Sequence, residues 1–229
     1  MDKKKITARV LIYLAGMVLL ALGLSLNSRV SLGVSPIVSI GFVFSCLTPI
    51  NYGDATFVLY CVLVLIQVII HVCRKNYRAV IPTLLQIVLS LVFTRFMNLF
   101  VRLIPDFAGD LAGTWMGSLP GRILFLLFAI VLTGTGAATT LNMQLIPNPG
   151  DGIVQTVADA VKKSTGFAKN CVDVICVIIS VICSLLIGGR IYGVGIGTLC
   201  GMLLTGRVIA LFNHFARQPM KKAAGLDVA

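Results

Sequence analysis

Residues 9–36, RVLIYLAGMVLLALGLSLNSRVSLGVSP, decide the fold, because the chain repeats their pattern 113 residues later. Residues 122–149 read RILFLLFAIVLTGTGAATTLNMQLIPNP and align without a gap. Matches of Leu and Val carry little weight in an apolar chain, whereas matches of Arg, Gly and Pro carry more. These matches pair Arg9 with Arg122, Gly23 with Gly136, and Pro36 with Pro149. The alignment indicates two related halves, each opening with a long apolar run and a proline break.

The composition excludes most classes of soluble protein. Hydrophobic residues make up 58% of the 229 residues, charged residues make up 12%, and the mean hydropathy is +0.99. A soluble domain has about 45–50% apolar and about 25% charged residues. The apolar runs are continuous and do not alternate, which also excludes a β-barrel. The sequence therefore predicts an all-α membrane protein.

Six apolar runs are long enough to cross a bilayer, because a hydrocarbon core about 30 Å thick needs about twenty helical residues. They are residues 8–28, 55–73, 79–103, 121–142, 170–187 and 191–213. Two shorter segments, 33–48 and 150–163, follow the first run of each half. The first run is too long to be the apolar core of a cleavable signal peptide. We expect six transmembrane helices.

The net charge of +11 follows the positive-inside rule. With six crossings and a cytoplasmic N-terminus, fourteen cations lie inside and five outside. The outer cations are Arg29, Arg95, Arg102, Arg122 and Arg190. Because the cations interrupt apolar runs and form no basic face, nucleic acid is not an expected partner. Both termini are expected in the cytoplasm.

The spans divide into two halves of three, which makes the second half enter the membrane from the opposite side. We expect two inverted three-helix repeats, residues 1–103 and 121–217, each with a short re-entrant or interfacial half-helix, 33–48 or 150–163. Residues 104–120 are expected to form an extracytoplasmic linker. Residues 218–229 are expected to form a cytoplasmic tail. Inverted repeats are typical of secondary transporters.

The two half-helices mark the expected binding site. Each follows a proline or glycine break, and non-helical backbone at membrane depth persists only inside protein or beside a cavity. We therefore expect the site between the half-helices, near the membrane midplane. For 150–163 an alternative is an amphipathic helix on the membrane surface, since its polar and apolar residues separate onto two faces.

Asp151 is the main candidate for substrate binding or ion coupling, because an acid near the bilayer is costly and often marks an ion or substrate path. Its alternative role is a helix cap, which is also the expected role of Asp54. The other polar candidates are Asn148, Asn142, Gln144, Ser35, Ser39 and Asp173. The expected structural residues are Pro36, Pro149, Gly193, Gly197 and Gly201, the glycines forming a packing stripe on the sixth span.

Other site chemistries have no support in the sequence. It contains no nucleophile–base pair, no phosphate-binding loop and no close spacing of metal ligands. We therefore expect no catalytic residue, metal or cofactor. The seven cysteines fall mostly within apolar runs and are expected to be reduced.

Three motifs resemble the YczE/YyaS/YitT group of bacterial membrane proteins over residues 9–213. They are LGVSP (32–36), PGDGI (149–153) and GGRIYGVGIGTLCGMLLTGRVIALF (188–212). The resemblance implies a bacterial cytoplasmic membrane and a Pro-x-Asp element in each half. Asp151 completes the second element, whereas Val38 stands where the first would have its acid. A symmetric pair of acids is therefore not expected.

Three functions fit the pattern. The first is a secondary transporter or facilitator of a small solute or ion. The second is the substrate-binding membrane subunit of a vitamin importer, which works with a separate ATPase. The third is a non-transporting accessory membrane protein. The lipid bilayer is an expected partner. The sequence does not identify the substrate or the coupling ion, and it does not decide whether the protein forms a homodimer.

The orientation predicts the accessibility of two loops. A cysteine at Gly109 should react with an impermeant maleimide applied outside intact cells, because the linker is expected there. A cysteine at Lys75 should react only after permeabilisation. Labelling in the reverse order would contradict the cytoplasmic termini, and labelling of both positions from the same side would contradict the inverted arrangement.

Overall fold

The computed structural model describes residues 3–226, and these residues form helices and connecting turns without a strand. Six helices are long and apolar enough to span a membrane. They are α1 (Lys3–Val30), α3 (Tyr52–Cys73), α4 (Val80–Leu103), α5 (Leu119–Asn142), α7 (Thr165–Gly188) and α8 (Ile196–Ala223). Two short helices are α2 (Pro36–Leu47) and α6 (Pro149–Val161), and a 3-10 turn, Tyr77–Ala79, precedes α4. The predicted all-α fold with six spans is confirmed: this is a multi-pass membrane protein.

The last predicted span is misplaced at both ends. The helix starts at Ile196 because Gly193 and the residues around it form a loop, with a left-handed φ of +67° at Gly193. It continues to Ala223, so residues 218–223 of the tail predicted at 218–229 are helical. Residues 227–229 lie outside the described chain.

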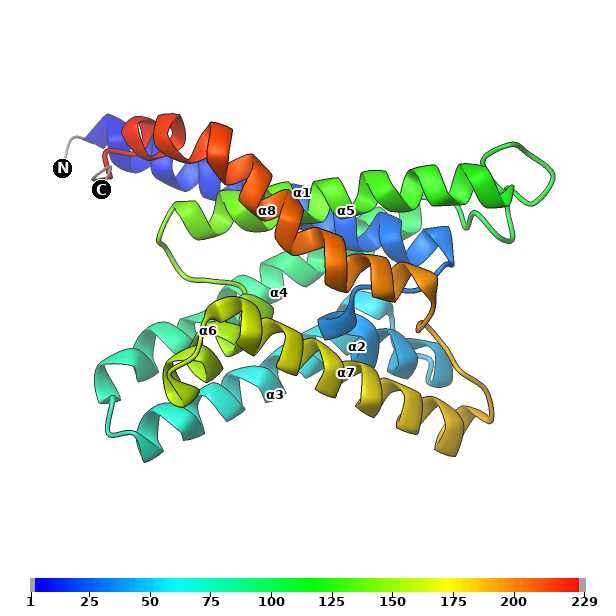
Figure 1. Ribbon diagram of the computed structural model, residues 1–229, viewed down its shortest axis with the longest axis horizontal. Coiled ribbons are helices and arrows are strands. Elements are labelled where there is room, and N and C mark those ends of the chain that lie inside the picture. Colours follow the sequence, from blue (N-terminus) through cyan, green and yellow to red (C-terminus); the bar gives the residue numbers. More distant parts are fainter. Residues whose placement is uncertain (1–2, 227–229) are drawn as a thin grey trace.

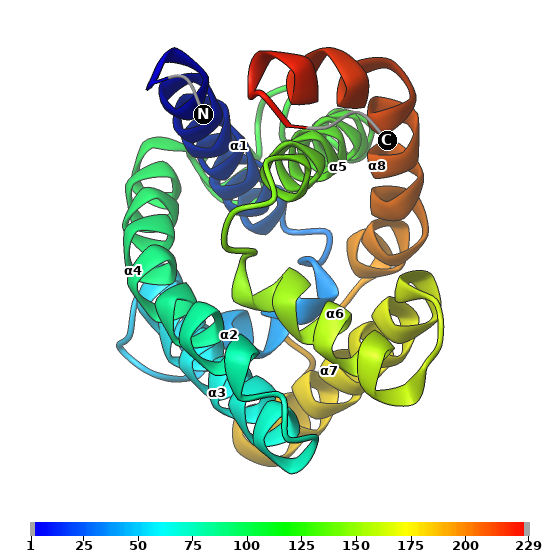
Figure 2. The same cartoon turned by 90° about the vertical axis from the view of Figure 1, so that its left-hand side faces the viewer.

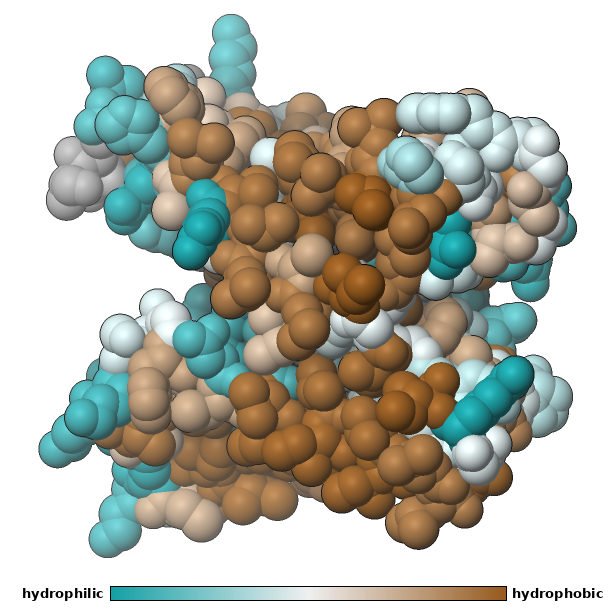
Figure 3. Space-filling model, turned by 45° about the vertical axis from the view of Figure 1, so that its right-hand side comes forward, coloured by the Kyte–Doolittle hydropathy of each residue, from teal (hydrophilic) through white to brown (hydrophobic). Residues whose placement is uncertain are grey.

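The long helices run between two ends of the molecule. Figure 1 shows both termini at one end, together with the turns near residues 75 and 163. The opposite end holds the connections 48–51, 104–118 and 189–195. The space-filling view shows a broad apolar band between these ends (Figure 3). Exposed apolar side chains of this kind suit a lipid environment.

Helices α1 and α5 run antiparallel side by side in the upper part of Figure 1 and approach closely at glycines. A Cβ atom at Gly23 would lie 2.6 Å from the backbone nitrogen of Thr133. A Cβ atom at Gly136 would collide in the same way with Leu20. Gly23 and Leu20 lie 113 residues before Gly136 and Thr133, so the two contacts are the same contact with the halves exchanged.

Two arginines make a second exchanged pair of contacts. Arg9 donates from Nε to the carbonyl of Met143, at 2.7 Å, and from Nη2 to that of Gln144. Arg122 donates likewise to Val30, at 2.8 Å, and to Ser31. The offset of 113 residues relates all these positions. Each arginine therefore binds the carbonyls at the end of the other half's first helix, and the inverted orientation of the halves stays a prediction.

The short helices α2 and α6 lie inside the ring of long helices, as the view from the termini shows for α6 (Figure 2). Helix α2 packs against α3 and α7, and α6 packs against the same two helices. Their first turns meet, because a Cβ atom at Gly150 would lie 3.2 Å from a side-chain carbon of Ile37. The alternative of a surface helix at 150–163 does not match this packing.

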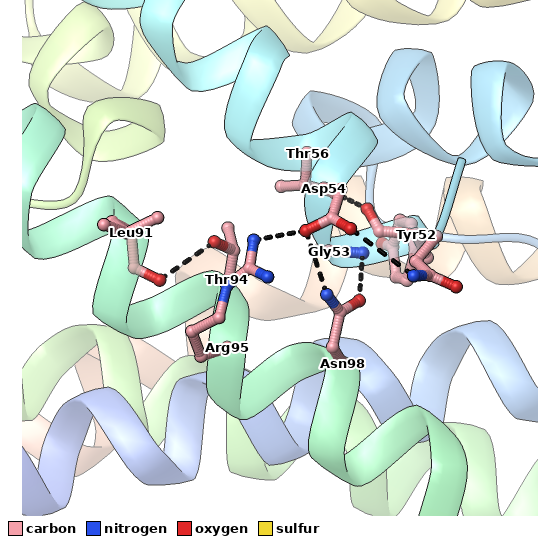
Figure 4. Close-up of polar contacts among 9 residues, drawn as sticks. Tyr52, Gly53, Asp54, Thr56, Leu91, Thr94, Arg95 and Asn98 are labelled. Carbon is pink, nitrogen blue, oxygen red and sulfur yellow. Dashed lines mark hydrogen bonds and ion pairs between the residues drawn. The ribbon is translucent and has the colours of Figure 1, made fainter.

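Equivalent helix pairs of the two halves pack unequally. Helix α3 packs extensively on α4, whereas α7 and α8 scarcely touch. A polar cluster fastens α3 to α4 (Figure 4). Asp54 accepts hydrogen bonds from Arg95 and from Nδ2 of Asn98, and the Asn98 Oδ1 accepts from the backbone of Gly53 at 2.8 Å. Asp54 is therefore not the predicted cap, a position that Asn51 takes.

The second half lacks these fastening residues. Continued past Pro36, the alignment at an offset of 113 places Phe167 opposite Asp54. After a gap of two residues, 77–100 align with 192–215, which places Ala210 opposite Arg95. Gly166 corresponds to Gly53, and a Cβ atom there would meet nothing within 4 Å. The gap between α7 and α8 therefore has a cause in the sequence.

The close approach of α1 and α5 makes a prediction about stability. Gly23→Ala should destabilise the detergent-solubilised protein by about 1–3 kcal/mol, because its methyl group overpacks the contact with Thr133. The control is Gly206→Ala on α8, where a Cβ atom meets nothing within 4 Å. Thermal unfolding of both variants tests this, and equal melting temperatures would contradict it.

Candidate functional site

A central cavity of about 60 Å³ lies where the first turns of α2 and α6 meet. Ser35 and Asn148, the residues before these two helices, both line it. Helices α1, α3, α5, α7 and α8 complete its wall, so both halves contribute. The polar and charged residues of the wall are Ser35, Tyr60, Thr133, Asn148, Asp151, Lys169 and Thr205. The predicted location between the half-helices thus coincides with a cavity.

Asp151 lies on the cavity wall, but it is not the cap of α6. The cap is Asn148, whose side-chain oxygen accepts from the backbone nitrogen of Gly150 at 3.2 Å. Asp151 is three positions into the helix, in its first turn, where the helix dipole favours a negative charge. The carboxylate of Asp151 makes no hydrogen bond or ion pair within the described chain.

Lys169 and Asp173 form an ion pair beside the cavity. The Lys169 ammonium lies 2.9 and 3.2 Å from the two carboxylate oxygens of Asp173. Asp173 is completely buried and does not line the cavity, whereas Lys169 does. Asp173 therefore reaches the site only through Lys169. Sequence reasoning placed Asp173 in the site and missed Lys169.

The other predicted polar residues lie apart from the cavity. Asn142 donates to Asn213 on α8 at 2.7 Å. Gln144 is exposed and has a left-handed φ of +49°. Ser39 is buried and shares a hydrogen bond of 2.6 Å with Ser180 on α7. These three side chains hold helices together or end them.

Among the predicted structural residues, the two prolines have the expected role, whereas Gly193 does not. Pro36 and Pro149 each open a short helix at its first position, as expected. Gly197 lets α8 approach the chain before α2, since a Cβ atom would lie 2.7 Å from the carbonyl oxygen of Gly33. Gly193 belongs to the preceding loop, so the predicted three-glycine stripe is wrong.

A second, smaller cavity lies on the other side of α6. Its volume is about 10 Å³, and α4 lines it through Leu89, Ser90 and Phe93. Ser90 aligns with Thr205, which lines the larger cavity from α8. The α4 wall of the smaller cavity and the α8 wall of the larger cavity thus contain equivalent residues of the two halves, and the two cavities differ in volume. The unequal packing of α3 on α4 and of α7 on α8 accounts for the difference.

Beside α6, two amides that the sequence analysis did not single out bind each other. Gln67 and Gln86 exchange hydrogen bonds of 3.2 Å, and both lie against Gly152. Their signal in the sequence was a buried polar residue in the middle of each of two apolar runs. Within residues 3–226, no group of three or more His, Cys, Asp or Glu side chains is placed to hold a metal ion.

Comparison with protein families gives one match, to the family of unknown function DUF6198, over residues 7–214. The chain belongs to this family. The comparisons with curated proteins and with solved structures gave no match. The resemblance to the YczE/YyaS/YitT group stays a prediction, because the family match does not extend to it.

The observed cap makes a prediction that separates Asn148 from Asp151. Asn148→Ala should cost about 0.5–2 kcal/mol of stability, because it leaves the backbone nitrogen of Gly150 without its acceptor. Ser35→Ala is the matched control, since Ser35 makes no side-chain cap bond at the start of α2. Equal loss of thermal stability in both variants would contradict the role of Asn148.

Proposed function

We propose that this protein is a secondary transporter or facilitator of a small solute, which binds in the central cavity between α2 and α6. The observation that carries the proposal is the pair of unequal cavities beside the start of α6, about 60 Å³ with a wall from α8 and about 10 Å³ with a wall from the equivalent helix α4. A carrier needs a site that opens to one side of the membrane at a time. Two cavities of unequal volume, one bounded by α4 and one by α8, fit that requirement.

The exchanged contacts support an inverted repeat. In such proteins the two halves adopt two packings in turn, and each conformation resembles the other with the halves interchanged. The α7–α8 pair and the α3–α4 pair are equivalent interfaces of the two halves. In this proposal, the loosely packed α7–α8 pair shows the open arrangement and the tightly packed α3–α4 pair shows the closed one. Opening of α3 from α4, with closing of α7 on α8, would expose the site to the other side.

The cluster of Asp54, Arg95 and Asn98 is the gate in this proposal. It fastens the ends of α3 and α4 that lie away from the chain termini (Figures 1 and 4). The surface is hollowed at the same end as the termini (Figure 3). With the predicted orientation, the hollow at the termini is the proposed way to the site from the cytoplasm, and the gate closes the site from outside.

The proposal also places the protein in a bacterial cytoplasmic membrane with both termini inside. The turns near residues 75 and 163 share one end of the molecule with the termini, as the charge analysis requires (Figure 1). No catalytic step is part of the proposal.

Cysteine labelling at the two related cavity positions tests this. In a background whose seven native cysteines are replaced, Thr205→Cys and Ser90→Cys report on the wide and the narrow cavity. In oriented vesicles, an impermeant maleimide should label Thr205→Cys from the cytoplasmic side and leave Ser90→Cys largely unlabelled. Asp54→Ala removes the gate and should make Ser90→Cys reactive from outside while slowing the labelling of Thr205→Cys.

Asn51→Ala is the matched control, because it removes a neighbouring polar group without removing the contact between Asp54 and Arg95. If Asp54→Ala does not change the labelling of Ser90→Cys or of Thr205→Cys, the proposed alternation between the two packings is contradicted. Uptake by the reconstituted protein alone would separate a transporter from a subunit that requires an ATPase.

A further inference from the structure

The central cavity carries a negative charge without a matching cation. Asp151 and Lys169 are the charged side chains on its wall. The ammonium of Lys169 already binds both oxygens of Asp173, at 2.9 and 3.2 Å. The two carboxylates and one ammonium therefore sum to one negative charge. Because an unpaired carboxylate away from water costs several kcal/mol, a positive occupant of the cavity is favoured.

An anionic occupant is disfavoured despite the two helix N-termini that face the cavity. Pro36 and Pro149, at the first positions of α2 and α6, have no N–H to offer. The Asn148 side chain occupies the nitrogen of Gly150. The carboxylate of Asp151 is itself an anion in the first turn of α6, and a second anion would be repelled.

The rest of the wall indicates the kind of cation. A multivalent metal ion prefers several carboxylate or imidazole ligands, and the described chain places no three such groups together. Most of the remaining wall is apolar, with a few hydroxyl and amide groups. The apolar members are Leu20, Leu24, Ile37, Val38, Ala137 and Ile209. A wall of this kind suits a cation that carries carbon.

We propose that the central cavity binds a small organic monocation, an ammonium or guanidinium compound, at Asp151, and that Lys169 is a tethered cation that competes for the same carboxylate. The proposal rests on the proposed solute site and names the class of its ligand. A volume of about 60 Å³ admits a cation of only a few non-hydrogen atoms.

Lys169 has the chemistry and position of a competitor. Its ammonium is carried on a flexible four-carbon chain, and its charge acts on both Asp151 and Asp173. Asp173 holds Lys169 away from Asp151 and keeps the site free for the ligand. Asp173 is thus a positioning residue, acting on the ligand through Lys169.

Binding to the purified full-length protein tests the charge of the ligand. Thermal shift is measured with methylammonium, tetramethylammonium and guanidinium chlorides, with sodium chloride as the control for ionic strength. Urea, the neutral isostere of guanidinium, and acetate, an anion, complete the set. At least one organic cation should raise the melting temperature, and urea and acetate should not. Asp151→Asn should weaken the cation's binding at least about tenfold, whereas Asp159→Asn, which removes an exposed acid of the same helix, should not.

A rescue experiment tests the role of Lys169. Asp173→Asn releases Lys169 to pair with Asp151, so it should weaken cation binding about as much as Asp151→Asn does. Adding Lys169→Met to Asp173→Asn removes the competitor and should restore binding to at least the wild-type level. A purely structural role of Asp173 predicts no such rescue, because the double variant has lost the whole ion pair.

Three results would overturn the proposal: no stabilisation by any of the cations, equal stabilisation of Asp151→Asn, or no rescue by Lys169→Met. Binding and transport are measured separately. Cation binding without uptake in vesicles would keep this site and reject the transporter. Uptake of a neutral or anionic solute without cation binding would reject this site alone.

Discussion

The fold depends on how its backbone satisfies its hydrogen bonds at two breaks inside a membrane protein. The chain leaves the helical path after Val30 and again after Asn142, where the last carbonyl groups of each helix have no partner within the helix. Arg9 and Arg122 supply the donors at these two places. Because each arginine comes from the opposite half, these bonds also fix how α1 and α5 lie against each other. The start of α2 and α6, and hence the cavity between them, follows from that arrangement.

The difference between the halves arises from few residues. The contacts around α1, α5 and the short helices keep their equivalents when the halves are exchanged. The contact of Asp54 with Arg95 has none, since Phe167 and Ala210 stand in their places. The hydrogen bonds between Gln67 and Gln86 likewise join α3 to α4 only. In the proposed function, a nearly symmetric frame with these asymmetric fastenings would favour one of two packings without making the other impossible. Such a frame would have the bistability that the proposed change of conformation requires.

Much of the fold was predictable because it depends on the length of apolar runs and on proline. The six spans and the two short helices follow from these features. The position of the cap was not predictable, because the shift from Asp151 to Asn148 depends on where α6 begins. The loop at Gly193 was not predicted, because the four-residue spacing of the glycines is the same whether the first of them lies in the helix or in the loop before it. The position of Lys169 on the wall of the central cavity could not be predicted from the sequence, because it depends on how α7 packs against α6 in the tertiary structure. The pairing of Asn142 with Asn213, 71 residues apart, likewise has no local signal.

The exchanged arginine contacts also have a consequence for biogenesis. The carbonyls of Val30 and Ser31 have their donor in Arg122, which the ribosome adds about ninety residues later. Proteins are synthesised from the N-terminus at about 5–20 residues per second. These two carbonyl groups are therefore made several seconds before their donor is available. During that interval the nascent first half needs another hydrogen-bond donor, supplied by water, by lipid headgroups or by the insertion machinery.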